Sequence, residues 1–367
     1  MTARDDALAI LNGEHPERSA ASFDFANAPL RTRGAQSKGR LPVFSGLPSL
    51  TVPGLNAAGV RYSQAHTDAQ RMARAAASTY ELFGFESAVV PFDLCVEAET
   101  LGCEIDFQEE EAGVYLAPTV SGPLSVDLDP ERVLTQPERS TRIPRVCAAL
   151  DELKNTVGAH IIIGAWIPGP FTLAWQLFGA DAWLTLTQQN PARAKLWLTS
   201  LTPFLAHTAA RYRASGADFL SIHEMGGSPQ VIGPATFRAL VQPALTHLLT
   251  ALPSPRVLSV CGDTNAVIAD LAACGAEALS VDHRCDLARA RHTLGPRATL
   301  LGNFDPVGLL GRGTPEAIVA AVQRIAPHVN ALWPGCDLSP DTPEENMRAL
   351  ITAAQNVRAK HSPETGQ

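Results

Sequence analysis

Side chains that can bind metals, act as nucleophiles or move protons come directly after short apolar segments of this 367-residue sequence. Thiols and imidazoles are common metal ligands, and thiols, imidazoles and carboxylates also serve in nucleophilic and acid–base catalysis. Asp93 ends one apolar segment, and a carboxylate in that position must be solvated, paired or used in chemistry. The other polar side chains at or next to the ends of the apolar segments are His223, Glu224, Cys261, Asp282, His283, Asn303 and Cys336.

The apolar segments themselves predict the fold. Each is rich in apolar and β-branched residues, as buried strands are, and amphipathic stretches long enough for helices separate most of them. Strands that alternate with helices form a parallel sheet, and eight such units in succession are typical of a closed (β/α)8 TIM barrel. In such barrels the active site lies at the carboxyl ends of the strands, where the reactive side chains stand here. The predicted strands span residues 42–44, 88–93, 160–166, 218–223, 257–261, 278–282, 299–303 and 330–333.

The other segments predict how the chain divides. We expect residues 1–40 to form an N-terminal helix and a polar lead-in, residues 41–359 to form a single catalytic barrel domain, and residues 360–367 to form a frayed tail. The stretch 102–120, with an acidic run at 109–111, predicts a β-hairpin inserted after the second strand.

Composition excludes several classes of protein. The formal net charge of −8 and the absence of a basic cluster argue against a nucleic-acid partner. The apolar stretch 161–186 is interrupted by Pro168, Gly169 and Pro170, so we expect no membrane span. The N-terminus lacks the apolar core of a secretion signal, and the seven cysteines are an odd number, which favours a cytoplasmic protein without disulfides.

Several short motifs occur in an order and spacing that chance does not readily produce. They are PFDLCVEAETLGC at 91–103, GPFTL at 169–173, the stretch 234–243, GN at 302–303, and PGC at 334–336 followed by TPEEN at 342–346. In these motifs the chain resembles the uroporphyrinogen decarboxylase superfamily, and in particular its corrinoid-dependent methyltransferase branch. The resemblance covers roughly residues 40–355.

The loop after the first strand bears on which branch the chain resembles more. Uroporphyrinogen decarboxylases hold a substrate with many carboxylates by an arginine pair in this loop, whereas residues 45–54 contain no arginine. Asp93 does match the aspartate that binds pyrrole nitrogens in the decarboxylases, but Cys336 stands where they have a histidine. The resemblance therefore favours the methyltransferases.

The methyltransferase branch implies a zinc site made of a His-x-Cys motif after the fifth strand and a Cys after the eighth. Cys261 and Cys336 match the two cysteines, but Ser259 occupies the histidine position, and serine is a poor zinc ligand. Related zinc-dependent methyltransferases place a carboxylate ligand where Asp282 stands, and either His283 or His223 could supply the imidazole. We expect Zn2+ to be held by Cys261, Cys336, Asp282 and His283, with His223 and Ser259 against the cofactor.

Such a site implies alkyl transfer to a thiol, because zinc keeps a bound thiolate deprotonated and nucleophilic at neutral pH. The implied donor is a methyl-corrinoid, either methylcobalamin or a separate corrinoid protein, since the chain has no Asp-x-His-x-x-Gly corrinoid-binding motif. The expected acceptor is a small thiol, with a pterin as an alternative. The residues expected to orient the acceptor or to take a proton are Asp93, Glu97, Glu224 and Asn303.

Other interpretations stay open on the sequence alone. The chain could be a decarboxylase of a tetrapyrrole acid, which Asp93 favours, or a non-catalytic barrel that binds a corrinoid protein, which Ser259 favours. Cys261 and Cys336 could be small packing residues, the usual role of a buried cysteine. Glu97 could serve only to stabilise the N-terminus of a helix.

Overall fold

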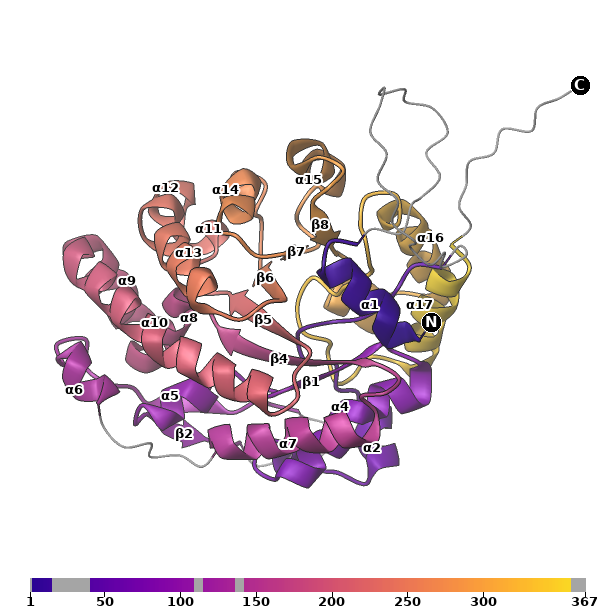
Figure 1. Ribbon diagram of the computed structural model, residues 1–367, viewed down its shortest axis with the longest axis horizontal. Helices are drawn as coiled ribbons and strands as arrows, with labels where there is room; N and C mark the ends of the chain where they lie inside the picture. Colours follow the sequence, from indigo (N-terminus) through magenta and orange to yellow (C-terminus); the bar gives the residue numbers. More distant parts are fainter. Residues whose placement is uncertain (1, 15–39, 109–114, 136–141, 358–367) are drawn as a thin grey trace, which may run out of the picture.

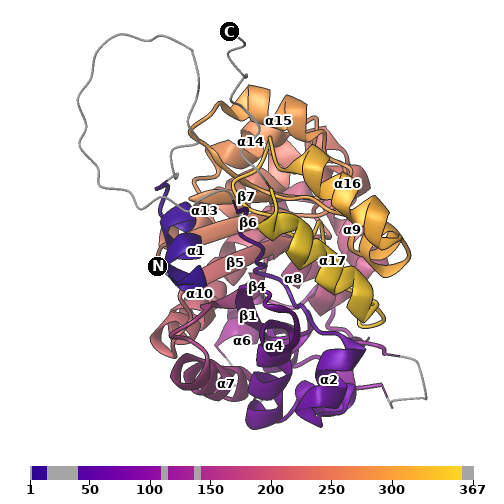
Figure 2. The same ribbon diagram turned by 90° about the vertical axis from the view of Figure 1, so that its right-hand side faces the viewer.

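The computed structural model describes residues 2–14, 40–108, 115–135 and 142–357. Within these residues the centre of the fold is a six-stranded parallel sheet in the order β1-β4-β5-β6-β7-β8, and the helices lie around the strands (Figures 1 and 2). This α/β architecture confirms the predicted alternation. The strands are β1 (Ser87–Val90), β4 (Ile162–Pro168), β5 (Phe219–Glu224), β6 (Arg256–Val260), β7 (Ala278–Val281) and β8 (Thr299–Leu301).

Two of the eight predicted strands are bridging segments instead of full strands, so that prediction is wrong for residues 42–44 and 330–333. Single parallel bridges join Val43 to Leu332, Leu301 to Ala331, and Phe304 to Pro334. At the other edge of the sheet, the Glu86 amide donates to the Val43 carbonyl at 2.9 Å. Pro42 lacks the N–H that a continuous ladder requires, and its carbonyl accepts from the Leu332 amide at 2.8 Å.

Helices connect the strands, and several have clear start and stop signals. Helix α4 begins after Asp68, whose carboxylate accepts from the Arg71 amide at 2.9 Å, and ends at Gly84, whose φ of +80° favours glycine. Over the described residues the helical segments are α1 (Ala3–Leu11), α2 (Val52–Ala58), α3 (Tyr62–Ala65), α4 (Ala69–Phe83), α5 (Val96–Thr100), α6 (Pro130–Leu134), α7 (Arg142–Thr156), α8 (Pro170–Phe178), α9 (Ala180–Gln189), α10 (Pro191–Ala214), α11 (Pro229–Ile232), α12 (Pro234–Thr236), η1 (Phe237–Val241), α13 (Gln242–Ala251), α14 (Ile268–Ala273), α15 (Leu287–Leu294), η2 (Pro306–Gly311), α16 (Pro315–Ile325) and α17 (Glu344–Gln355).

The insertion after the second predicted strand is a β-hairpin, as expected. Strands β2 (Glu104–Asp106) and β3 (Thr119–Gly122) pair antiparallel and form a sheet of their own. The acidic run at 109–111, most of the lead-in (residues 15–39) and the tail from 360 lie outside the described residues.

The apolar stretch 161–186 divides into a strand and helices. Strand β4 ends at Pro168, and α8 begins at Pro170, so the two prolines mark the expected break. Nowhere in the described parts of the chain is there a helix with the length and apolarity that a membrane crossing requires.

Helix α1 covers the amino-terminal end of the sheet (Figure 1). Its Arg4 guanidinium pairs at 2.8 Å with Asp218, the residue before β5. Its buried side chains join a second apolar cluster, whose members on β4, β5 and β7 are the first residues of those strands. The carboxyl ends of these strands remain for the functional site. The cluster comprises Ala7, Ile10, Leu11, Phe44, Ile162, Phe219, Val257, Ala278, Leu301, Ala331 and Trp333.

We expect Ile10→Ala to lower the free energy of unfolding by about 2–5 kcal/mol, because it leaves a cavity in this cluster. Ile10 is only 2% exposed. Urea denaturation of the wild type and of Ile10→Ala measures this loss. Asp5→Asn is not a suitable control, although Asp5 is exposed, because Asp5 caps α1. A loss below about 0.5 kcal/mol would mean that α1 does not support the sheet.

Candidate functional site

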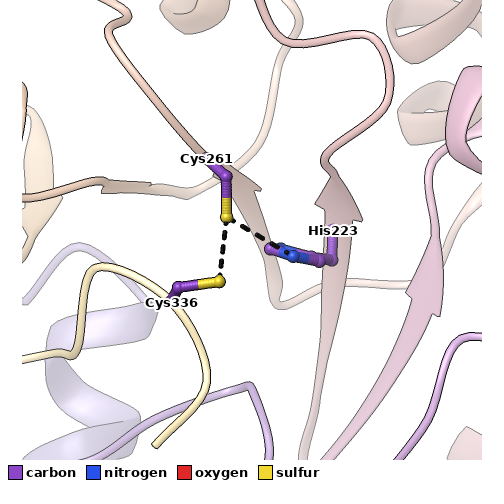
Figure 3. A group of neighbouring side chains, drawn as sticks. All are labelled: His223, Cys261 and Cys336. Carbon is purple, nitrogen blue, oxygen red and sulfur yellow. Dashed lines mark hydrogen bonds between the residues drawn. The ribbon is translucent and has the colours of Figure 1, made fainter. Parts of the chain in front are cut away.

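Three side chains of kinds that can bind a metal meet at the carboxyl ends of the strands (Figure 3). His223 lies near the end of β5, Cys261 follows β6 directly, and Cys336 follows the bridging segment 330–333. The Cys261 Sγ lies 3.2 Å from the Cys336 Sγ and 3.6 Å from the His223 Nε2. Within the described residues, one ligand atom from each of the three lies within 4.8 Å of the others.

Strand register and one glycine account for this convergence. Strands β5 and β6 are parallel neighbours in which His223 pairs with Ser259, so Cys261 falls just beyond the end of β6 on the side of His223. The turn that carries Cys336 passes close to the end of β7. A Cβ at Gly335 would lie 2.7 Å from the His283 amide nitrogen, so the turn requires glycine there.

The two thiols form a coupled pair. The hydrogen bond from Cys261 to Cys336, together with burial, raises the pKa of Cys261 well above that of an ordinary thiol. The same hydrogen bond, aided by the His223 ring, lowers the pKa of Cys336 well below the ordinary value. The two thiols therefore titrate as one pair and not as independent groups.

The donor set suits a soft divalent metal. Two sulfurs and one imidazole nitrogen are ligands that zinc prefers, and three protein ligands match catalytic zinc sites, which keep one position open. His223 is buried, whereas Cys336 is partly exposed. The arrangement is thus able to hold a metal that a small molecule can reach.

The structure does not bring Asp282 and His283 into this group. The Asp282 Oδ1 lies 3.1 Å from the His283 Nδ1, and the His283 Nε2 lies 3.8 Å from an Asp305 carboxylate oxygen. Asp282 and His283 therefore pair with one another beside the turn that carries Cys336. Sequence analysis left open whether His283 or His223 supplies the imidazole, and the structure brings His223 to the cysteines.

Asn303 holds a loop together. Its side-chain amide donates to the backbone carbonyls of Asp282 and Cys285, both at 2.9 Å. These two bonds connect the residue after β8 with the turn after β7, and they use both amide hydrogens. The side-chain nitrogen of Asn303 is thus engaged within the protein.

Asp93 belongs to a buried ion-pair network. Its Oδ2 lies 2.7 Å from the His66 Nδ1 and also accepts from the Arg142 guanidinium, and its Oδ1 accepts from the Cys95 amide at 2.9 Å. Burial alone would raise the pKa of Asp93, but Arg142 and His66 outweigh it and hold the pKa well below its usual range. Sequence analysis missed both partners.

A sequence signal for Arg142 does exist. It stands on the same helical stripe as Val146, Leu150 and Leu153 in α7, all of them buried. An arginine on an apolar stripe must find an anionic partner, because a lone buried charge is strongly unfavourable. For His66, which follows the short helix α3, we find no comparable signal.

Glu224 supports the turn between β4 and α8. Its carboxylate accepts from the Phe171 amide at 3.1 Å, from the Gly227 amide at 2.9 Å and from the Thr172 hydroxyl. The GPFTL motif is therefore tied to the end of β5, beside His223. Gly169 is needed because any Cβ there would collide with the Glu224 carboxylate.

Glu97 is buried in the helical layer. The Tyr212 hydroxyl of α10 approaches its carboxyl group at 3.4 Å. Burial, together with the nearby Asp93 charge, raises the pKa of Glu97 to about 8. The side chain is therefore protonated at neutral pH and is part of the packing between α5 and α10.

Sequence and structure comparisons show which known proteins this chain is similar to. The family model for uroporphyrinogen decarboxylase (URO-D) matches residues 35–357. The methylcobamide:CoM methyltransferase MtaA of Methanosarcina barkeri is 31% identical over 87% of this chain and 94% of its own length. A methylated-thiol–coenzyme M methyltransferase of Methanosarcina mazei is 29% identical over 81% of this chain and 79% of its own. The solved structure of a methyltransferase from Methanosarcina mazei has a TM-score of 0.81 at 27% identity and covers 96% of this chain and 98% of that one.

We expect Asp93→Asn to lower the free energy of unfolding by about 3–5 kcal/mol, because the buried Arg142 loses its nearest anionic partner. Chemical denaturation measures the loss, and the exposed Asp127→Asn serves as a matched control. If both variants unfolded alike and only Asp93→Asn lost activity, Asp93 would have the catalytic role that the sequence suggested.

We expect Glu97→Gln to flatten the dependence of stability on pH. The unfolded chain releases this proton near the ordinary pKa of 4.5, whereas the folded protein keeps it up to about 8. The stabilisation is therefore complete below pH 4.5 and disappears as the pH approaches 8. Between these values the wild type should lose up to about 1.4 kcal/mol per pH unit relative to the variant.

Denaturation curves across this range measure that difference. The exposed Glu81→Gln is the control and should follow the wild type. Parallel curves for wild type and Glu97→Gln would contradict a protonated, buried Glu97.

Proposed function

The chain belongs to the uroporphyrinogen decarboxylase family, and within it we propose that the protein is a methyltransferase that moves a methyl group from a methyl-corrinoid to a small thiol. The observation that carries the proposal is the convergence of His223, Cys261 and Cys336 at the carboxyl ends of the strands. Similarity to a methylcobamide:CoM methyltransferase over 87% of the chain supports this donor and makes coenzyme M the first acceptor to test.

In this proposal, His223 Nε2 and the two cysteine sulfurs hold a zinc ion. When bound, zinc lowers the pKa of an acceptor thiol and keeps the resulting thiolate nucleophilic. The three ligands leave one position for that thiol. Asp282 and His283 are left out of the ligand set, because they pair with one another and with Asp305.

The protein holds Cys261 in place through the turn that follows β6. The Ser228 hydroxyl donates to the Cys261 carbonyl at 2.6 Å, and the Asp263 amide donates to the Gln230 side-chain carbonyl at 2.9 Å. Ser228 and Gln230 both belong to the segment that follows β5, and β5 is the strand that carries His223. Hydrogen bonds thus connect the turn that carries the thiol to the segment next to the imidazole, which favours a preorganised ligand set.

The surface around the site supports docking of a separate corrinoid protein. Three large apolar side chains are exposed on the segments that follow β5 and β8, namely Met225 (36%), Val231 (52%) and Val307 (46%). They follow the carboxyl ends of β5 and β8, and the cysteines also lie at the carboxyl end of the sheet. Free methylcobalamin is the simpler donor for an assay.

Two other functions have less support. A decarboxylase would use Asp93 to bind pyrrole nitrogens, but Arg142 and His66 occupy its carboxylate. A non-catalytic barrel is suggested by the serine at position 259, where a histidine ligand is expected. That argument loses its force because His223 brings an imidazole to the cysteines.

We also propose that residues 41–359 act as one catalytic domain in the cytoplasm. A single large core cluster extends from Leu41 to Ala354. All seven cysteines are free thiols, as a reducing compartment would keep them.

We expect Cys261→Ser and Cys336→Ser each to abolish methyl transfer from methylcobalamin to coenzyme M. Each should also weaken zinc binding by more than the roughly 100-fold that a lost outer partner of a ligand costs. Zinc affinity is measured by competition with a chromophoric chelator, and methyl transfer by the absorbance change of the cobalamin.

Cys147→Ser is the matched control, since Cys147 is partly exposed and lies outside the group. It should bind zinc and transfer methyl groups like the wild type. The proposed function would be contradicted if the wild type took up no zinc. It would also be contradicted if none of the thiols tested served as an acceptor for the methyl group of methylcobalamin.

A further inference from the structure

The two nitrogens of the His223 ring have different neighbours. The Nε2 lies 3.6 Å from the Cys261 sulfur, whereas the Nδ1 lies 3.3 Å from the Ser259 hydroxyl. Ser259 is the register partner of His223 on β6 and is 2% exposed. The cysteine and the serine thus contact opposite sides of one imidazole.

This arrangement matters because a neutral imidazole can bind a metal only through the nitrogen that carries no hydrogen. The other nitrogen then carries the hydrogen and needs an acceptor, and that acceptor fixes both the tautomer and the plane of the ring. A serine oxygen can accept such a bond. It also adds no charge to a site that already contains two thiols.

A tryptophan restricts the same ring from another strand. Trp166 of β4 contacts His223 edge to face, with ring centroids 5.8 Å apart and an interplanar angle of 85°. Its own indole nitrogen donates to the Pro91 carbonyl at 2.7 Å, so the tryptophan is held in turn. The His223 ring is therefore confined by β4 and by β6.

We propose that Ser259 is a positioning residue: it accepts a hydrogen bond from His223 Nδ1, and so directs the free lone pair of Nε2 toward the metal. This inference rests on the proposed role of His223 as a metal ligand. Serine is a poor zinc ligand, so Ser259 would act on the site through His223 and not by binding the metal.

The neighbouring strand offers a matched control. Ser280 of β7 is the register partner of Ser259 on its other side and is equally buried, at 2% exposure. Within the described residues its hydroxyl has no hydrogen-bond partner. Ser280→Ala therefore removes the same atom from the same region without touching His223.

The first test compares zinc affinities by chelator competition. We expect Ser259→Ala to weaken zinc binding about 10–100-fold, the usual cost of losing the outer partner of a histidine ligand. Ser280→Ala should bind zinc like the wild type. In a His223→Ala background, the further change Ser259→Ala should have no effect, because the serine acts through the imidazole. Equal affinities of Ser259→Ala and Ser280→Ala, or an undiminished effect without His223, would overturn the proposal.

The second test needs no metal and so separates this proposal from the proposed function. In metal-free protein labelled with 15N-histidine, at a pH where the ring is neutral, the nitrogen shifts of His223 report its tautomer. We expect a larger share of the Nδ1–H tautomer in the wild type and in Ser280→Ala than in Ser259→Ala, because only the first two proteins keep the acceptor for Nδ1. A tautomer unchanged by Ser259→Ala would overturn the role of the serine, whether or not the wild type binds zinc.

Discussion

The parallel register of β5 and β6 is the constraint on which the site depends. It pairs His223 with Ser259 and places Cys261 just beyond the end of β6, so that a histidine, its hydrogen-bond partner and a thiol come from two adjacent strands. A slip of one residue would turn these side chains to the opposite face of the sheet. Residues on both faces of β5 and β6 are buried, so a slip would force each side chain into a packed space that fits a different one.

The polar side chains at the strand ends divide into two groups. His223, Cys261 and Cys336 point toward one another and keep one side accessible. Asp93 and Glu224 are also buried, but donors of the protein itself surround them. A buried carboxylate needs such partners, and a carboxylate that has them is poorly placed to bind a substrate as well. Glu224 therefore supports the turns beside His223, and Asp93 supports the loop that follows β1.

The apolar cluster around α1 and the candidate site lie at opposite ends of the sheet. The amino-terminal end is filled by large apolar side chains and covered by α1, whereas the carboxyl end carries the hydrogen-bonded turns and the thiols. This division lets the turns after β5 and β6 differ in sequence without loss of the core.

The sequence by itself determined the alternation of strands and helices, the hairpin insertion and the two cysteines, because hydrophobic periodicity and short motifs are local properties of the chain. It overestimated the pairing of residues 42–44 and 330–333, which form single bridges in place of continuous ladders. Only the tertiary structure decided that His223, and not His283, joins the cysteines, and that Arg142 and His66 occupy Asp93. Those outcomes depend on which strand ends face one another and on where a buried charge finds its partner, and both are set by contacts between residues far apart in the chain.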